Sequence, residues 1–112
     1  PTTYRAVFRW SSASDQRLLL SKEAVNGITN RLRARVHRDF PVPEVAEEVL
    51  RLVYAAAKDE RVQAAIVLSA SGDLSGIRSG ADLAIIDWRD VLVNGGLANE
   101  SWNAVLQAEL GL

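Results

Sequence analysis

Cysteine is absent from this sequence, and histidine occurs once, as His37. Without a thiol the chain cannot form disulfides, use a cysteine nucleophile or bind a metal through thiolates. A mechanism that needs a histidine base would have to use His37, which lies in a basic segment typical of a solvated surface. Long apolar runs are also missing, which argues against a membrane-spanning helix. The start of the chain lacks a basic region followed by an apolar one, so we expect a cytoplasmic protein.

Other motifs that carry chemistry are missing as well. The glycines form neither a phosphate-binding loop nor a dinucleotide-binding fingerprint, and no serine lies in a nucleophile elbow. Asp87 and Asp90 lie three residues apart, but two carboxylates are too few for a Mg²⁺ or Ca²⁺ site, and Asp87 is interpreted as a helix N-cap. We therefore predict no enzyme activity, no cofactor and no metal.

What is present is the composition of a small globular protein. The 112 residues are 48% hydrophobic and 24% charged. This length and composition predict one domain over 1–112, with room for one hydrophobic core. Within it we distinguish a strand or hairpin segment at 1–20, a basic segment at 21–40 and a helical body at 43–112.

The net charge of -1 hides an asymmetry between the two ends of the chain. Residues 1–39 carry eight basic groups against three acids, whereas residues 40–112 carry five against eleven. Such a split can mark a nucleic-acid or partner surface. We favour the simpler interpretation that the two parts face each other in one fold and neutralise each other, because a total charge near zero attracts polyanions weakly.

The first segment has the alternation of a half-buried strand. Tyr4, Ala6, Phe8 and Trp10 fall on one side, with Arg5 and Arg9 on the other. After a serine-rich turn, the apolar run Leu18–Leu20 predicts the return strand of a hairpin. A two-stranded hairpin is marginal alone, so we expect it to pack on the helices.

Residues 21–40 allow two interpretations. A helix capped by Ser21 would place one apolar stripe inside, formed by Val25, Ile28, Leu32 and Val36. Alternatively, Asn26-Gly27 is a hairpin turn signal followed by alternation over 28–37. We choose the helix, because a mid-helix glycine costs only about 1 kcal/mol.

From Pro43 onward, capping residues divide the chain into helices. Proline suits the first position of a helix, aspartate and asparagine suit N-caps, and glycine suits the end. The expected helices span 44–58, 59–70, 74–86, 88–94 and 100–110. The apolar run within 59–70 could equally be a buried strand, but Asp59 and Gly72 favour a helix. We expect 88–94 and 100–110 to form an αα-hairpin through Asn94-Gly95-Gly96, with Trp88 and Trp102 in the core or at the rim of an interface.

These elements predict a mainly α fold: a small bundle of about five helices with an N-terminal β-hairpin packed on it. The alternative is an α+β fold with further strands at 28–37 and 64–70.

The functional hypothesis is a small non-enzymatic protein–protein interaction module acting as an adaptor, regulator or inhibitor. The strand over residues 2–10 could extend a partner's sheet or pair with its twin in a homodimer. The alternative is a nucleic-acid-binding protein that uses the basic N-terminal third, because arginines interleaved with aromatics can grip phosphates and stack bases. The candidate partner-binding residues are Tyr4, Arg5, Phe8, Arg9, Trp10, Arg31, Arg35 and Arg38.

Overall fold

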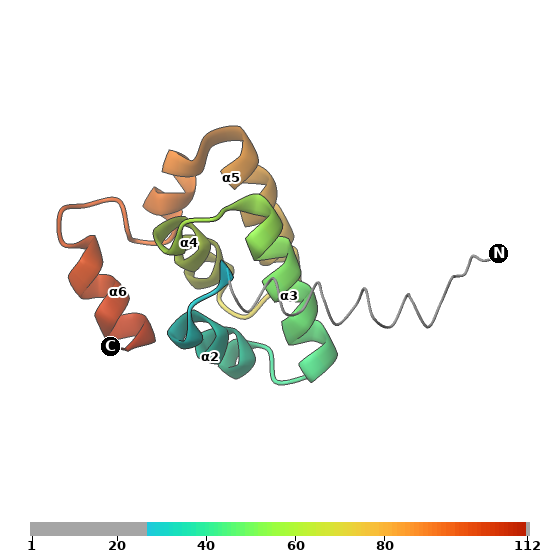
Figure 1. The fold of residues 1–112 in the computed structure, drawn as a ribbon. Coiled ribbons are helices and arrows are strands. Elements are labelled where there is room, and N and C mark those ends of the chain that lie inside the picture. Colours follow the sequence, from blue (N-terminus) through green and yellow to red (C-terminus); the bar gives the residue numbers. More distant parts are fainter. Residues whose placement is uncertain (1–26, 112) are drawn as a thin grey trace.

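The computed structural model describes residues 27–111, and this part of the chain forms five α-helices (Figure 1). They are α2 (Asn30–Asp39), α3 (Pro43–Ala56), α4 (Glu60–Ala70), α5 (Leu74–Asn94) and α6 (Trp102–Leu110). The mainly helical prediction is confirmed for the described residues. The hairpin predicted at 1–20 lies outside them.

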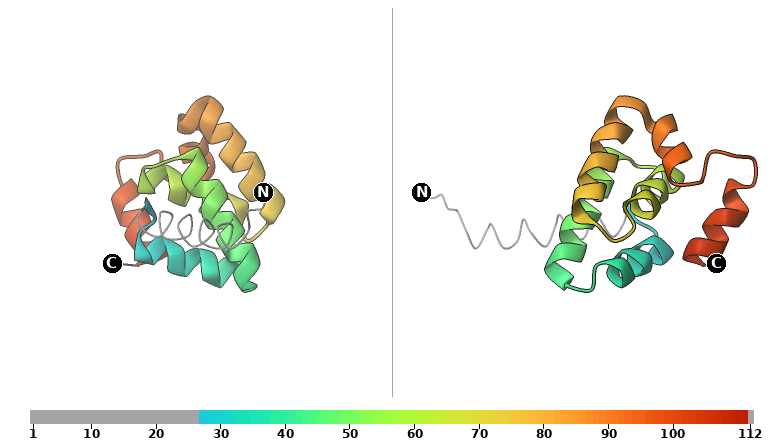
Figure 2. Two further views of the ribbon diagram at one scale, coloured as in Figure 1. Left: turned by 45° about the vertical axis from the view of Figure 1, so that its right-hand side comes forward. Right: turned by 180° about the vertical axis from the view of Figure 1, so that it is seen from behind.

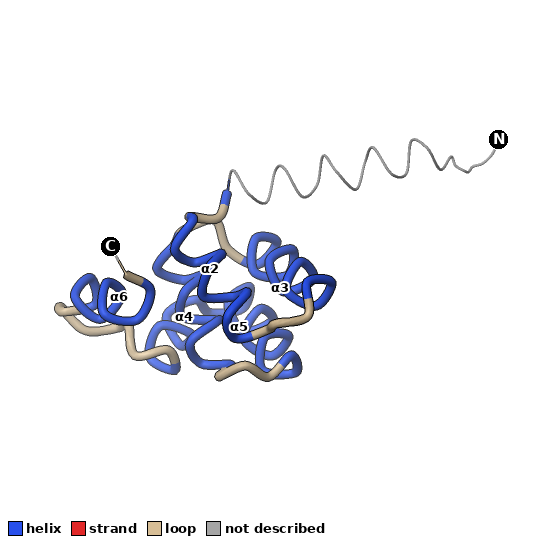
Figure 3. The backbone as a smooth tube through the Cα atoms, turned by 90° about the horizontal axis from the view of Figure 1, so that it is seen from below, coloured by secondary structure: helices blue, strands red, loops and turns tan. Residues whose placement is uncertain are grey.

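Helix α4 is the centre of the bundle, with α5, α3 and α2 packed around it (Figures 1 and 2). Its residues 62–67 are all buried, which explains why this segment is apolar nearly all round. Leu32 on α2 and Leu50 on α3 are likewise fully buried, and one hydrophobic cluster extends from Ile28 to Leu106. Seen from below, α6 lies at one side of this body, next to α2 (Figure 3).

Both strands of the alternative α+β interpretation are wrong in this structure. Residues 30–39 and 60–70 are helical, so neither 28–37 nor 64–70 forms a strand. Local caps decide this outcome. The carboxylate of Asp59 accepts a hydrogen bond from the Val62 backbone N–H at the start of α4, and Ser71 adopts a left-handed conformation at its end.

The helix predicted over residues 21–40 is not continuous. Helix α2 begins at Asn30, because Thr29 is its N-cap and has an extended backbone. The predicted start at Ser21 lies outside the described residues. The Thr29 hydroxyl accepts a hydrogen bond from the backbone N–H of Leu32 and so offers the chain an alternative to a continuing helix. Three residues of the predicted apolar stripe, Ile28, Leu32 and Val36, are buried as expected.

The predicted break between residues 86 and 88 is confirmed. Asp87 has φ −154° and ψ 94°, so α5 consists of two helical pieces joined at this residue. The Asp87 carboxylate accepts a hydrogen bond from the backbone N–H of Arg89 at 3.1 Å, which is the role of an N-cap. The direction of the chain therefore changes at Asp87.

Glycines let α4 and α5 approach closely. A Cβ atom at Gly76 would lie 2.9 Å from the Cα of Ala70, and one at Gly80 would lie 3.2 Å from a methyl group of Ile66. These residues therefore provide contact between backbones, as their spacing of four suggests.

The predicted αα-hairpin between 88–94 and the last helix is wrong. Helix α6 packs on α2 instead of returning onto α5. Leu97 is buried at the start of the connection, and its carbonyl accepts a hydrogen bond from Arg61 at 2.9 Å. The Arg61 guanidinium also lies 4.6 Å from the centre of the Trp102 ring. These contacts hold the connection between α5 and α6 against α4, so that α6 reaches α2.

Candidate functional site

The structure places three of the eight predicted partner-binding residues. Arg31, Arg35 and Arg38 lie on α2. The other five, Tyr4, Arg5, Phe8, Arg9 and Trp10, fall outside the described residues, and their roles stay predictions.

Arg31 is committed to contacts within the chain. Its guanidinium binds both carboxylate oxygens of Glu60 at 2.7 and 2.8 Å, a bidentate pair in which both side chains are about four-fifths buried. It also donates to the backbone carbonyl of Gly111 at 2.8 Å. The Thr29 hydroxyl donates to the same Glu60 carboxylate. This cluster fastens the start of α2 to α4 and to the end of α6.

Arg35 makes a second clamp one turn further along α2. It binds Asp39 at 3.1 Å, and it donates to both the side chain and the backbone carbonyl of Glu109. Cations near the last carbonyls of a helix are favourable because these carbonyls have no partner within the helix. Two arginines thus hold the C-terminal end of α6.

The pKa values of these groups follow from their contacts. The hydrogen bond with Glu60 raises the pKa of Arg31, against the opposing effect of burial. Burial lowers the pKa of Arg35, but hydrogen bonds to Glu109 and Asp39 outweigh it and the net change is upward. The hydrogen bond from Arg31 lowers the pKa of Glu60, again against burial. Both arginines therefore stay charged, and Glu60 stays ionised to lower pH than an ordinary glutamate.

We expect the Glu60→Gln variant to have a free energy of unfolding about 1 kcal/mol lower than the wild type at pH 7, because it loses the charge-assisted hydrogen bonds from Arg31. The loss is no larger because solvent screens this partly exposed pair. Because the pKa of Glu60 is lower in the folded state, its ionised form stabilises the fold at pH values above the ordinary glutamate pKa. This contribution to stability is lost as the pH falls through the folded-state pKa. The difference between variant and wild type should therefore shrink below about pH 4.5. Urea unfolding at pH 7, 5 and 3 measures it, and a constant difference across this range would contradict the assignment.

Arg38 is the most exposed of the three arginines. Its side chain is 69% exposed and lies 3.8 Å from Asp39. Elsewhere on α2, Arg33 and His37 both approach the carboxylate of Glu47, at 3.0 and 3.4 Å. His37 is thus a half-exposed surface residue beside one carboxylate, as predicted.

Basic residues of the N-terminal part, 1–39, form ion pairs with acidic residues of the remainder, 40–112. The ion pairs Arg31–Glu60, Arg33–Glu47 and Arg35–Glu109 each join the basic N-terminal part to the acidic remainder. This favours the interpretation that the two parts neutralise each other. It also means that α2 does not present its arginines as one free basic surface.

A different surface is exposed and apolar. Ile85 and Ile86 are 70% and 81% exposed, and Trp88 is 52% exposed on the other side of the break at Asp87. We call these three residues the α5 face. Several large apolar side chains exposed within a few residues of one another mark interaction sites more often than single exposed ones do.

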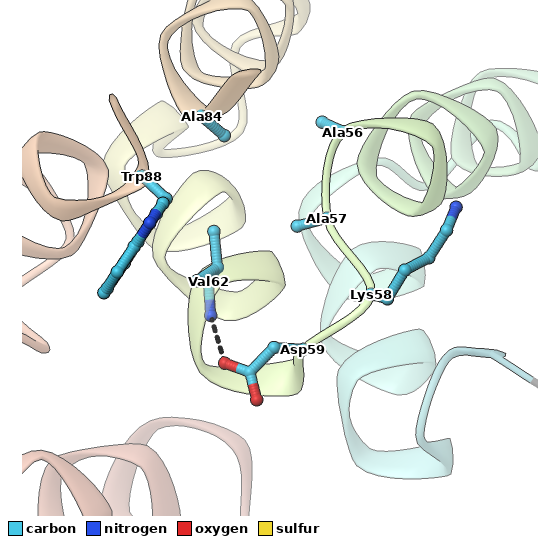
Figure 4. A pocket seen from close by; sticks show the side chains of 7 residues that line it. All are labelled: Ala56, Ala57, Lys58, Asp59, Val62, Ala84 and Trp88. Carbon is cyan, nitrogen blue, oxygen red and sulfur yellow. Dashed lines mark hydrogen bonds between the residues drawn. The ribbon is translucent and has the colours of Figure 1, made fainter. Parts of the chain in front are cut away.

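A pocket of about 390 Å³ lies beside the α5 face. We call it the α3–α5 pocket. Figure 4 shows the small side chains of Ala56, Ala57 and Ala84 directed toward it, with Val62 below and the Trp88 ring along one edge. Its remaining lining residues are Lys58 and Asp59. The Lys58 side chain turns away and lies over the Tyr54 ring, and Asp59 is occupied as the cap of α4. The pocket therefore suits an apolar ligand group.

Buried Gln63 supports one wall of this pocket. Its side-chain amide donates to the carbonyl of Ala57 at 2.9 Å and to that of Gly27 at 3.2 Å. It is 1% exposed. The bond to Ala57 fixes the connection between α3 and α4, and the bond to Gly27 places the first described residue next to this connection.

Sequence reasoning missed the α5 face. Trp88 was expected in the core or at an interface rim, and it is half exposed. Helical spacing gave a signal for one residue of the α5 face: Ile86 falls opposite the buried stripe of Ile77, Ala81 and Ala84. Ile85 is four residues after Ala81, so the spacing does not indicate its exposure.

The described residues contain no cluster of three or more acidic or histidine side chains able to hold a metal ion. None of the helices within 27–111 is long and apolar enough to cross a membrane. No protein-family model, curated protein or solved structure matches the chain.

Proposed function

We propose that this protein is a small non-enzymatic protein–protein interaction module, an adaptor, regulator or inhibitor, and that the α5 face contacts its partner. The observation that carries this proposal is the exposure of Ile85, Ile86 and Trp88 beside an apolar pocket. Tryptophan at the centre of an apolar patch is the residue type that contributes most to binding at protein interfaces.

The charges of α2 favour a protein partner over a nucleic acid. A phosphate backbone would need free arginines, whereas Arg31 and Arg35 are bound to Glu60, Asp39 and Glu109. Releasing them for phosphates would also loosen α6. Pairing through the strand at residues 2–10, including pairing into a homodimer, remains part of the hypothesis.

The double variant Ile85→Asp/Ile86→Asp tests the α5 face. We expect a partner that co-purifies with the wild type from its native source to be lost, with affinity falling at least about tenfold, or about 1.4 kcal/mol, because two charges would enter an apolar contact. Mass spectrometry identifies the partner, and calorimetry measures its affinity.

Val42→Asp is the matched control, since Val42 is a 54% exposed apolar residue at the start of α3. It should keep the partner. Equal loss in both variants, or retention of every partner by the double variant with its helical content intact, would show that the α5 face is not the binding surface.

A further inference from the structure

The first described residue lies close to the α3–α5 pocket. One amide nitrogen, that of Gln63, bonds to the carbonyls of both Gly27 and Ala57, and Ala57 lines the pocket. Gly27, to which the preceding part of the chain is joined, is therefore separated from the pocket wall by no more than the side-chain amide of Gln63.

The size of the surface favours a short segment over a second folded copy. A standard protein–protein interface takes about 20–30 residues from each partner. The pocket has seven lining residues, and the α5 face adds two isoleucines to them. A volume of about 390 Å³ lies at the small end of ligand pockets, enough for a few apolar side chains.

The chain itself contains such a segment at a suitable distance. Leu18, Leu19 and Leu20 form an uninterrupted apolar run, and Leu20 is seven residues before Gly27. Seven residues span at most about 23–25 Å. That exceeds the separation of Gly27 from the pocket wall, which a single glutamine side chain bridges.

We propose that Leu18–Leu20 of the same chain occupy the α3–α5 pocket. Attachment raises the effective concentration of the segment to the millimolar range, so a contact too weak to form between separate molecules becomes populated within one molecule. The proposal gives the predicted hairpin a defined docking site on the helical body. It does not depend on an external partner, although a partner on the α5 face would compete with the segment.

Disulfide trapping tests the proposal directly, because the full chain has no cysteine of its own. The variant Leu19→Cys/Ala57→Cys joins the segment to the pocket, and Leu19→Cys/Ala34→Cys is the control. Ala34 is exposed on α2 and is nearer in sequence to residue 19, so undirected collisions would favour the control.

Under mild oxidation we expect an intramolecular disulfide in the Ala57 pair to form at least about tenfold faster than in the control, because docking brings the two Cα atoms within the roughly 4–7 Å that a disulfide requires. Non-reducing gels and peptide mass spectrometry measure it. Equal rates in the two pairs, no disulfide in either, or a product that is mainly a cross-linked dimer would each overturn the proposal.

A second measurement needs no cysteine. In the variant Leu18→Asp/Leu19→Asp/Leu20→Asp, we expect the indole N–H resonance of Trp88 to shift and to exchange faster with solvent, because the pocket loses its occupant. Ser21→Asp is the control and should leave this resonance unchanged. A resonance of Trp88 that is the same in the wild type and the triple variant, with helical content retained, would overturn the proposal.

Discussion

Replacing Gly95 with alanine is expected to lower the free energy of unfolding by about 3 kcal/mol, the upper end of the usual cost of overpacking a core. A Cβ atom at this position would lie 2.6 Å from the Cα of Ala65 and 2.7 Å from its carbonyl oxygen. Both are backbone atoms of the buried central helix, so no rotamer change can relieve the overlap. Thermal unfolding followed by circular dichroism should show a fall in Tm of roughly 10–20 °C.

Ser79→Ala is the control for this variant. Ser79 is an exposed residue of the same helix, so its replacement should change the free energy of unfolding by less than about 0.5 kcal/mol. If the Gly95 variant is as stable as this control, the close approach of the end of α5 to α4 does not exist in solution.

Replacing Gln63 with glutamate is expected to destabilise the protein at pH 7 by about 3–5 kcal/mol, the usual consequence of an unpaired buried charge. The new carboxylate would face the carbonyl oxygens of Gly27 and Ala57, to which the glutamine amide donates. A donor would thus be lost and a negative charge would be placed against two acceptors. Urea unfolding measures the difference from the wild type.

The pH dependence of this variant provides an internal control. Burial and the two carbonyls would raise the folded pKa of the introduced glutamate, so the loss should be smaller at pH 4 than at pH 8, where the group is ionised only at a cost. Gln63→Leu, which cannot titrate, should show a loss of about 1–3 kcal/mol that does not vary in this way. Identical pH profiles for the two variants would mean that residue 63 is not buried against these carbonyls.

Helix ends could be predicted from the sequence where a side chain bonds to its own neighbours. Asp59, Asp73 and Asp87 each accept a hydrogen bond from a backbone N–H two or three residues later, and the sequence indicated this role for Asp59 and Asp87. The start of α2 was missed although Thr29 caps it in the same way. The four-residue apolar stripe with Ser21 before it offered a longer helix that satisfied the same pattern.

The candidate site was much less accessible to sequence reasoning. The α2 arginines were identified as candidates, but their ion pairs cross 29 and 74 residues of chain, and no periodicity reports such pairings. The α3–α5 pocket is likewise built from the end of α3, the start of α4 and the middle of α5.

The sequence by itself favoured a mainly helical fold and indicated where most of the helices within residues 27–111 begin and end, because capping bonds and apolar periodicity act between residues a few positions apart. Only the tertiary structure decided that α6 packs on α2, that the arginines there are paired, and that Ile85, Ile86 and Trp88 stay exposed. An apolar face specifies that a helix must pack, but not on which neighbour. That choice depends on the shape and charge of surfaces assembled from distant segments.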